Sequence, residues 1–183
     1  ALDRMGAIAV GIDQSEKQIE YARKFATLHN AVNTSFVVGT AEDLSRFDDE
    51  NFDMAVSAHM LNYVQRIEQT LRETARILKP GGSFALSVRH PADAMVSDQL
   101  PHRIEHSYWH AQHDWSWTFE DADPVRFRQW FWSVAQWFDM LTAAGFAVER
   151  IIEPEEAHGK DDDDTRARRA LVPFTLIMKA RKR

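Results

Sequence analysis

Short apolar runs recur along the first half of the chain at intervals that suit the strands of a buried sheet. They cover residues 7–12, 34–39, 53–57 and 83–88. Each run has the length of a strand rather than of a helix. Continuous apolar runs of this kind are typical of parallel strands that are buried on both faces.

Amphipathic stretches fill two of the intervals and predict helices. One begins at Ser15, which has Gln18 at the spacing of a capping box, and the other spans 67–78 and stops at Lys79 to Gly82. Strands that alternate with helices imply a parallel sheet with right-handed crossovers. The apolar stripes expected to be buried are Ile19, Ala22, Ala26 and Leu28 in the first helix and Ile67, Leu71, Ala75 and Leu78 in the second.

The second half of the chain begins with a different pattern. Residues 113–119 and 125–131 alternate between apolar and polar positions, and the segment from Glu120 to Pro124 between them is rich in turn-forming residues. This pattern predicts a β-hairpin outside the main repeat. An alternative is that Pro124 occupies the first turn of a helix behind Asp123.

After the hairpin the pattern returns to helix and strand. Ser133 and Gln136 form a second pair at capping-box spacing, and Gly145 ends the predicted helix. Two further strands are predicted at 146–152 and 171–178. The side of the helix expected to be buried carries Trp137, Phe138, Leu141 and Ala144.

Composition and charge narrow the possible functions. The chain has 183 residues, which suits one domain, and it contains no cysteine, which excludes disulfides and thiolate chemistry. A net charge of -6 argues against nucleic-acid or membrane-surface binding, and the basic run 179–183 is interpreted as a solvated tail. No apolar run approaches the ~20 residues of a membrane span. No signal peptide is visible, so we expect a cytoplasmic protein.

Acidic residues follow two of the predicted strands. Asp13 comes directly after the first strand, where a doubly wound sheet can hold the hydroxyls of a nucleotide ribose. Gly39 to Asp43 follows the second strand, where an acid beside backbone N–H groups can hold the edge of an adenine. The alternative for each is a loop acid or a helix cap.

Together these motifs resemble the class I S-adenosylmethionine-dependent methyltransferases, in particular their small-molecule branch. The resemblance implies a doubly wound, Rossmann-like α/β fold whose mostly parallel sheet has seven strands with the last one antiparallel. It also implies S-adenosyl-L-methionine as cofactor. The matching motifs follow the family's order along nearly the whole chain, at Gly11 to Ser15, Gly39 to Leu44, Asn51 to Asp53, Leu61 to Val64, Ala75 to Gly82, Ser87 to Pro91 and Ala144 to Phe146.

The resemblance also assigns roles to residues. It implies that Asp13 holds the ribose, that residues 41–43 surround the adenine, and that residues 57–59 lie near the methionine part of the cofactor. The cofactor-binding residues expected on this basis are Asp13, Gln14, Ala41, Glu42, Asp43, Ser57 and Ala58.

One part of the family pattern does not occur in the chain. The first strand and its glycine-rich turn should precede Ala1, and that strand normally lies between those starting near Ala7 and Asp53. We therefore expect that roughly 30 residues, one strand and a helix start, are missing upstream. The expected organisation is a single, N-terminally incomplete domain over residues 1–183 with an insertion at 91–132, and the chain as written should bind the cofactor poorly or not at all.

Methyl transfer requires mainly that the protein align the nucleophile of the acceptor with the methyl group, because the sulfonium cofactor is already activated. A base is needed when the acceptor arrives protonated. His59 and His90 follow strand ends on the ligand side, so both are candidate bases, with a substrate-contact or structural role as the alternative. The histidines between residues 102 and 113 match no known metal-ligand spacing, so no metal is predicted.

Aromatic residues concentrate in the insertion at 91–132. In the family this region covers the active site and selects the acceptor, so we expect an aromatic lid over a planar or hydrophobic small molecule. The alternative is that the rings pack the hairpin onto the core. The residues expected to contact the acceptor are Tyr63, Trp109, Trp115, Trp117 and Trp130.

The sequence thus supports an enzyme that transfers a methyl group from S-adenosyl-L-methionine to a small, aromatic or hydrophobic acceptor. A second hypothesis is a methyltransferase-like binding module that has lost cofactor binding. A third is an unrelated nucleotide-binding α/β protein such as a dehydrogenase. The third does not predict Glu42 and Asp43 together with the turn from Lys79 to Gly82.

Overall fold

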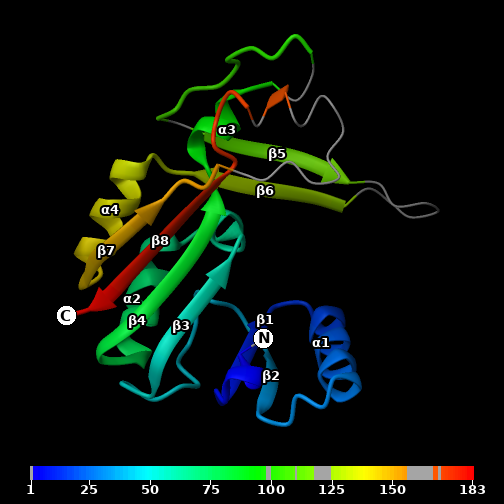
Figure 1. The fold of residues 1–183 in the computed structure, drawn as a ribbon, viewed down its shortest axis with the longest axis vertical. Helices are drawn as coiled ribbons and strands as arrows, with labels where there is room; N and C mark the ends of the chain where they lie inside the picture. Colours follow the sequence, from blue (N-terminus) through cyan, green and yellow to red (C-terminus); the bar gives the residue numbers. More distant parts are fainter. Residues whose placement is uncertain (1, 98–99, 110, 118–124, 156–166, 169) are drawn as a thin grey trace. The chain divides into compact units, whose positions relative to one another are not determined.

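The computed structural model describes residues 2–97, 100–109, 111–117, 125–155, 167–168 and 170–183. These residues form two compact units, one that ends at Phe47 and one that begins at Asp48. Figure 1 shows the helices and strands of both units.

The first unit is a β-α-β crossover preceded by one turn of 3-10 helix. It consists of η1 (Asp3–Met5), β1 (Ala9–Asp13), α1 (Glu16–Leu28) and β2 (Thr34–Val38). The two strands are parallel and in register from the start of β1 to its end. The predicted crossover between the first two strands is therefore confirmed.

The sequence signals of α1 are confirmed at its start and fail at its end. Ser15 caps the helix, and its hydroxyl accepts from the backbone N–H of Gln18 at 3.3 Å. Ile19 is buried, as the stripe predicted, but Leu28 is 77% exposed. Leu28 is the last residue of the helix, and this position leaves it outside the contact with the two strands.

The second unit contains a four-stranded mixed sheet. Its strands are β3 (Phe52–Ala58), β4 (Leu78–Arg89), β7 (Phe146–Ile152) and β8 (Thr175–Lys182), arranged in the order β3-β4-β8-β7. β3 and β4 are parallel, whereas β8 runs antiparallel to both of its neighbours. This confirms the antiparallel last strand.

Helices α2 (Ile67–Ile77) and α4 (Val134–Ala143) pack on this sheet and close one hydrophobic core. All four residues of the stripe predicted for α2 are buried. In α4 the capping box of Ser133 and Gln136 is present in both directions, and Trp137 is fully buried. Phe138 was expected in the core, but it is 46% exposed because it lies one position past the buried face.

Several element boundaries differ from those predicted. β4 begins at Leu78, so the turn through Gly81, with its positive φ of 76°, belongs to the irregular start of that strand. The last strand occupies 175–182 instead of 171–178, so the basic run is not a solvated tail. The reason is that Lys179 and Arg181 both pair with Glu149 of the neighbouring strand β7.

Two short helices were not predicted as such. η2 (Leu61–Tyr63) follows β3, and α3 (Pro91–Met95) follows β4. His90 caps α3, and Pro91 takes the first helical position, where its missing N–H costs nothing. The proline that ends the strand therefore also begins a helix.

The predicted hairpin is present as β5 (Ala111–Trp117) and β6 (Val125–Phe131), which pair antiparallel. Since β6 starts at Val125, the alternative of a helix behind Asp123 is wrong. The predicted turn from Glu120 to Pro124 lies outside the described residues. Figure 1 shows the two strands beside α3, away from the main sheet.

The described strands of the main repeat form two sheets rather than one continuous sheet. β1 pairs with β2, and β3 pairs with β4, while β1 and β3 are not neighbours in either sheet. On β3 the side chains of Met54 and Val56 are 49% and 55% exposed, which is unusual for a parallel strand of an α/β fold.

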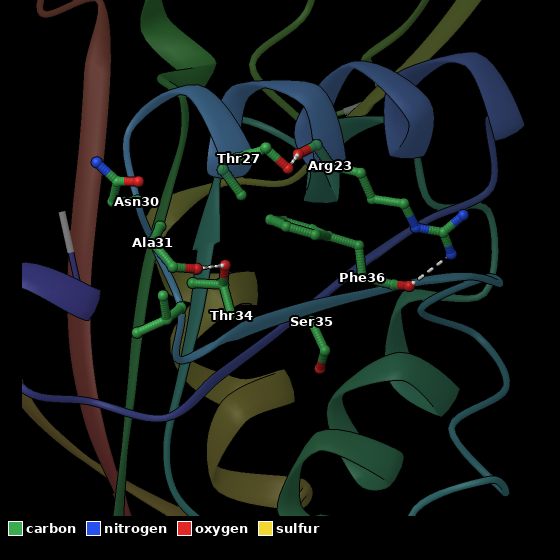
Figure 2. A pocket seen from close by; sticks show the side chains of 9 residues that line it. Arg23, Thr27, Asn30, Ala31, Thr34, Ser35 and Phe36 are labelled. Carbon is green, nitrogen blue, oxygen red and sulfur yellow. Dashed lines mark hydrogen bonds between the residues drawn. The ribbon is translucent and has the colours of Figure 1, made fainter.

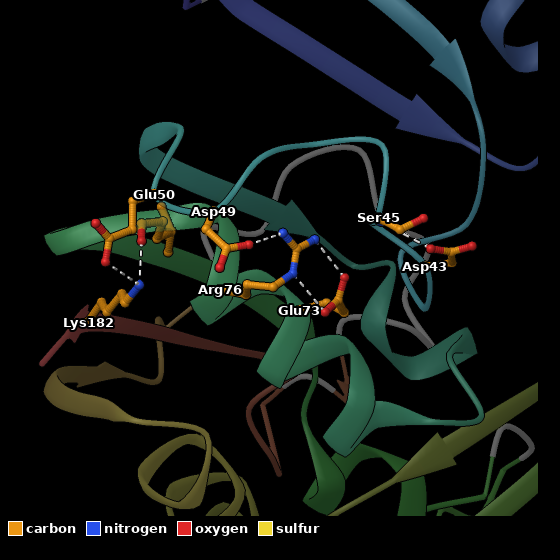
Figure 3. A network of polar contacts seen from close by, with 8 residues as sticks. Asp43, Ser45, Asp49, Glu50, Glu73, Arg76 and Lys182 are labelled. Atoms are coloured by element: carbon orange, nitrogen blue, oxygen red, sulfur yellow. Dashed lines mark hydrogen bonds and ion pairs between the residues drawn. The ribbon is translucent and has the colours of Figure 1, made fainter.

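A polar network ties the loop before β3 to the rest of the second unit (Figure 3). Arg76 of α2 contacts Asp49 at 2.7 Å and Glu73 at 2.8 Å, and these carboxylates raise its pKa above the usual arginine value. Lys182 of β8 donates to the carbonyl of Leu78 at 2.7 Å. These contacts lie around the start of β4, away from the carboxyl ends of β3 and β4.

Among the helices that the structure describes, none has the length and apolar character needed to cross a lipid bilayer.

The core of the second unit should depend strongly on Leu71, which is fully buried between α2 and the sheet. Replacing it with alanine should lower the free energy of unfolding by about 2–5 kcal/mol, because a cavity replaces packed methyl groups. Chemical denaturation monitored by circular dichroism measures this change. Leu171→Ala is the control, since that side chain is 64% exposed and its loss should cost less than about 0.5 kcal/mol. Equal losses in the two variants would contradict the assignment of the core.

Candidate functional site

In the first unit, the ends of β1 and β2 bring two predicted cofactor-binding segments together. The backbone N–H of Gly39, just past β2, donates to the carbonyl of Asp13 at 2.9 Å. The carboxylate of Asp13 accepts from the backbone N–H of Ser15 at 2.8 Å, and the residue is exposed. Gln14, the other residue predicted here, is exposed as well. Asp13 therefore lies at the edge where parallel sheets bind ligands, with a fixed carboxylate.

The segment from Thr40 to Arg46 folds over the end of β2 through local hydrogen bonds. The hydroxyl of Thr40 accepts from the N–H of Glu42 at 3.2 Å, and the carboxylate of Asp43 accepts from the N–H of Ser45 at 3.0 Å. Ala41 and Glu42 are half-buried, whereas Asp43 is exposed. The turns fix the backbone of residues 41–43 beside the end of β2, where the resemblance puts the adenine.

In the second unit, the carboxyl end of β3 presents Ser57 and His59. The hydroxyl oxygen of Ser57 is enclosed and has no hydrogen-bond partner among the described residues. Ala58, which follows it, is exposed. A buried polar atom of this kind is costly unless a ligand or water satisfies it.

His59 has a left-handed backbone with φ of 50°, an uncommon conformation for a residue other than glycine. Its N–H donates to the carbonyl of Ser87 on β4 at 2.8 Å, and its ring stacks on Phe174 with 6.3 Å between the ring centroids. Strained backbone of this kind persists where the surroundings enforce it, often at functional sites. The side chain is exposed and therefore accessible.

His90 is held differently, since both ring nitrogens contact the protein. Its Nδ1 accepts from the N–H of Ala92 at 3.0 Å, and its Nε2 lies 2.9 Å from a carboxylate oxygen of Glu153. An Nδ1 that accepts leaves the proton on Nε2, which then donates to Glu153. With the side chain 4–5% exposed, this geometry suits a helix cap better than a proton acceptor.

Asn62 was not predicted, and it connects three segments. It is 2% exposed, its Nδ2 donates to the carbonyl of Trp130 at 3.0 Å, and its Oδ1 accepts from the N–H of Arg89 at 2.8 Å. The loop after β3, the end of β4 and the hairpin strand β6 thus meet at one side chain. An asparagine between Leu61 and Tyr63 carries no periodic signal that could have revealed this role.

A buried carboxylate, Asp93, was also missed. It is 1% exposed, it pairs with Arg89, and its Oδ1 lies 3.1 Å from Nε of Arg168. Arg168 also donates to the backbone carbonyl of Asp93 at 2.7 Å. The guanidinium of Arg89 lies over the ring of Phe131 at 5.7 Å, so the cation is held by both a charge and an aromatic face.

Tyr63 is placed beside the hairpin. Its ring meets Phe127 edge-on with 6.2 Å between centroids, and its side chain is hydrogen-bonded to Gln129 of β6. Burial raises the pKa of its phenol above the usual value, while the hydrogen bond with Gln129 and the charge of Arg89 act in the opposite direction. A tyrosine that is still 40% exposed can contact a ligand at this edge.

The tryptophans of the insertion are not gathered into one cluster among the described side chains. Trp109 is 61% exposed and meets the ring of Tyr108, whereas Trp130 is half-buried. Trp115 and Trp117 are on β5, and their side chains lie outside the described part of the structure. An aromatic lid therefore remains an expectation.

A hollow of about 520 Å³ occurs in the first unit, away from the carboxyl ends of β1 and β2 (Figure 2). It lies between the second half of α1 and the start of β2. Two of its polar side chains bond to the backbone, since Arg23 donates to the carbonyl of Phe36 at 2.9 Å and Thr34 donates to that of Ala31 at 2.7 Å. Nothing in this lining resembles a catalytic constellation.

Within the described part of the chain, no group of three histidine, aspartate or glutamate side chains converges in a way that could hold a metal ion. The rings of His106 and His113 meet at a tilt of 51° with 4.3 Å between their centroids, which is an aromatic contact.

Comparison with known proteins agrees with this arrangement. Residues 1–86 match the family model described as a methyltransferase domain. The chain is 31% identical over 142 residues to YcgJ of Bacillus subtilis, which is described as an uncharacterized methyltransferase. The aligned residues cover 78% of this chain and 49% of YcgJ. It is also 32% identical over 87 residues to the ubiquinone biosynthesis O-methyltransferase of Saccharophagus degradans. This alignment covers 48% of this chain and 36% of that enzyme.

A solved structure shows the same fold over nearly the whole chain. The SAM-dependent methyltransferase of Methanosarcina mazei superposes with a TM-score of 0.69 and 21% identity, covering 99% of this chain and 84% of that one. The chain spans about half the length of YcgJ and about a third of the other relative. This chain therefore has the fold of these S-adenosylmethionine-dependent methyltransferases, and its residues 1–86 match the methyltransferase-domain model.

The environment of Tyr63 makes a testable prediction about its ionisation. Burial raises the pKa of Tyr63 in the folded protein. Phenolate formation can be followed by ultraviolet absorbance in the unchanged protein and in a Tyr63→Phe variant. The difference between the two titrations should show a phenolate step above the usual tyrosine pKa. The folded state favours the protonated phenol of Tyr63, so this group stabilises the fold at pH values below its pKa in the unfolded chain. That stabilisation is lost as the pH rises through the pKa of Tyr63 in the folded protein. A difference step at or below the usual tyrosine pKa would contradict the packing of Tyr63 against the hairpin.

Proposed function

We propose that this domain transfers a methyl group from S-adenosyl-L-methionine to a small acceptor that is aromatic or hydrophobic. The observation that carries the proposal is the meeting of Asp13 with the segment after β2, where the N–H of Gly39 bonds the carbonyl of Asp13. These are the positions that the family uses for the ribose and the adenine. They occur inside the matched methyltransferase domain.

Within the first unit, the donor groups at the ends of β1 and β2 suit the nucleoside part of this cofactor. The carboxylate of Asp13 would hold the ribose hydroxyls with Gln14 beside it, and residues 41–43 would enclose the adenine. The enclosed hydroxyl of Ser57 offers a polar partner to the methionine part, with Ala58 next to it. When bound, the cofactor supplies an activated methyl group, so the chain itself has to position the acceptor.

We assign the candidate base role to His59 rather than to His90. The ring of His59 is accessible, its backbone is held in the left-handed region, and the ring orientation is supported by Phe174. His90 uses both nitrogens in contacts with Ala92 and Glu153. A base at His59 would take the proton of a hydroxyl acceptor.

The acceptor side is assigned to the hairpin and to Tyr63. Phe127 and Tyr63 present aromatic surface, and Trp109 and Trp130 add to it in the same insertion. Trp115 and Trp117 stay candidates from the sequence alone. The name of the Saccharophagus relative, which acts in ubiquinone biosynthesis, supports an aromatic acceptor that carries a hydroxyl.

Asp13→Asn tests the cofactor assignment. The amide oxygen can still accept from the N–H of Ser15, so the turn is kept while the charge that holds the ribose is lost. Calorimetric titration with S-adenosylhomocysteine should show an affinity about tenfold to a hundredfold lower than that of the unchanged protein.

The matched control is Asp48→Asn, an exposed aspartate in the loop before β3. It should bind S-adenosylhomocysteine with unchanged affinity. If neither this chain nor a version extended upstream through the expected glycine-rich turn binds this compound, the methyltransferase proposal fails and the binding-module hypothesis takes its place.

His59→Asn tests the base. Asparagine tolerates the left-handed backbone and cannot accept the acceptor's proton, so the methyl-transfer rate should fall about a hundredfold or more. Transfer of a labelled methyl group to catechols and phenols measures it, with the exposed His29→Asn as control. A rate equal to that of the control would show that the acceptor loses its proton without His59.

A further inference from the structure

We infer that Asn62 is a positioning residue that fixes the hairpin β5–β6 on the loop after β3. Through this contact the acceptor side is held in place relative to Ser57 and His59. The assignment of those two residues to the cofactor and to the base rests on the proposed function. The contact made by Asn62 does not depend on the proposed function, because it is defined by hydrogen bonds that join three segments of the chain.

The two hydrogen bonds of Asn62 need one donor and one acceptor, and its side-chain amide carries both. The carbonyl of Trp130 needs a donor, and the N–H of Arg89 needs an acceptor. One amide supplies both, and these partners fix which atom is oxygen and which is nitrogen. An aspartate could accept from the N–H of Arg89 but could not donate to the carbonyl of Trp130. An apolar residue could make neither hydrogen bond.

The position of Asn62 in the chain connects it to the candidate site. η2 begins two residues after His59, and the N–H of His59 is itself bonded to β4 at Ser87. The loop after β3 is thus tied to β4 at both His59 and Asn62. A displacement at Asn62 would be transmitted along this short tied segment.

The hairpin side of the contact is broader than one bond. Tyr63, the next residue, meets Phe127 edge-on and is hydrogen-bonded to Gln129. Trp130, Gln129 and Phe127 are all on β6, so η2 contacts successive positions of one strand. Asn62 is the buried member of this contact, at 2% exposed, whereas Tyr63 is 40% exposed. Buried, well-directed hydrogen bonds set geometry more firmly than exposed ones.

Amide hydrogen exchange, followed residue by residue by NMR on the full chain, tests this role in the absence of ligand. In Asn62→Ala, the amides of β6 and of Arg89 should exchange about tenfold faster or more, because both hydrogen bonds are lost. In Asn62→Asp, β6 should loosen in the same way while the amide of Arg89 stays protected, since a carboxylate oxygen still accepts from it. The amides of β7 and β8 should keep their rates in both variants.

The control is Asn51→Ala, an exposed asparagine at the amino end of β3, which should change none of these rates. If the rates rise uniformly across β4, β7 and β8, Asn62 is a stability residue of the core and the inference is overturned. Unchanged rates in β6 overturn it as well.

A second arm separates this inference from the proposed function. Adding S-adenosylhomocysteine to the unchanged protein should slow exchange in β6, and in Asn62→Ala this protection should be lost even at saturating ligand. If the compound binds but leaves β6 unaffected, the inference is overturned while the proposed function stands. If it binds neither to these two forms nor to the chain extended upstream through the expected glycine-rich turn, the proposed function fails, and the ligand-free exchange rates still decide whether Asn62 positions the hairpin.

Discussion

The pairing of β4 with β3 on one side and with β8 on the other holds the second unit together. Phe84, Leu86 and Val88 of β4 enter the core under α2 and α4, so this strand cannot shift without opening that core. A strand fixed along its length has a fixed carboxyl end. The residues that could do chemistry in this unit are attached there, since His59 bonds Ser87 and Asn62 bonds Arg89. Their positions therefore depend on hydrophobic packing elsewhere in the unit.

At that end of the sheet, the buried side chains of His90 and Asp93 have partners that explain their burial. His90 caps α3 and contacts Glu153, and Asp93 lies between two arginines. Removing one member of such a set would leave the other buried and unpaired, which is costly. Because His90 and Asp93 already use their polar atoms in these contacts, they hold the site in place and do not take part in a reaction. The accessible ones, His59 and Tyr63, are better placed to meet a ligand.

The fold and the activity rest on different kinds of support. Similarity to a solved methyltransferase at 21% identity establishes how the strands are connected, and many such folds carry different chemistry. The activity is argued from the ends of β1 and β2, where Asp13 and the turns from Thr40 to Ser45 are fixed by backbone hydrogen bonds. Because these contacts are made by the backbone and by short side chains, they preorganise polar groups for a ligand before it binds.

The sequence by itself determined the order of strands and helices, the caps at Ser15 and Ser133, and the acids that follow β1 and β2. These features are local, because each depends on residues within about one turn of helix or one strand length. Tertiary structure alone decided that the basic run near the C-terminus pairs with Glu149, that Phe138 faces outward, and that Asn62 joins β4 to the hairpin. Those outcomes depend on which distant segment a side chain meets. Asn62 and Trp130 are far apart in the chain, and no periodicity links them.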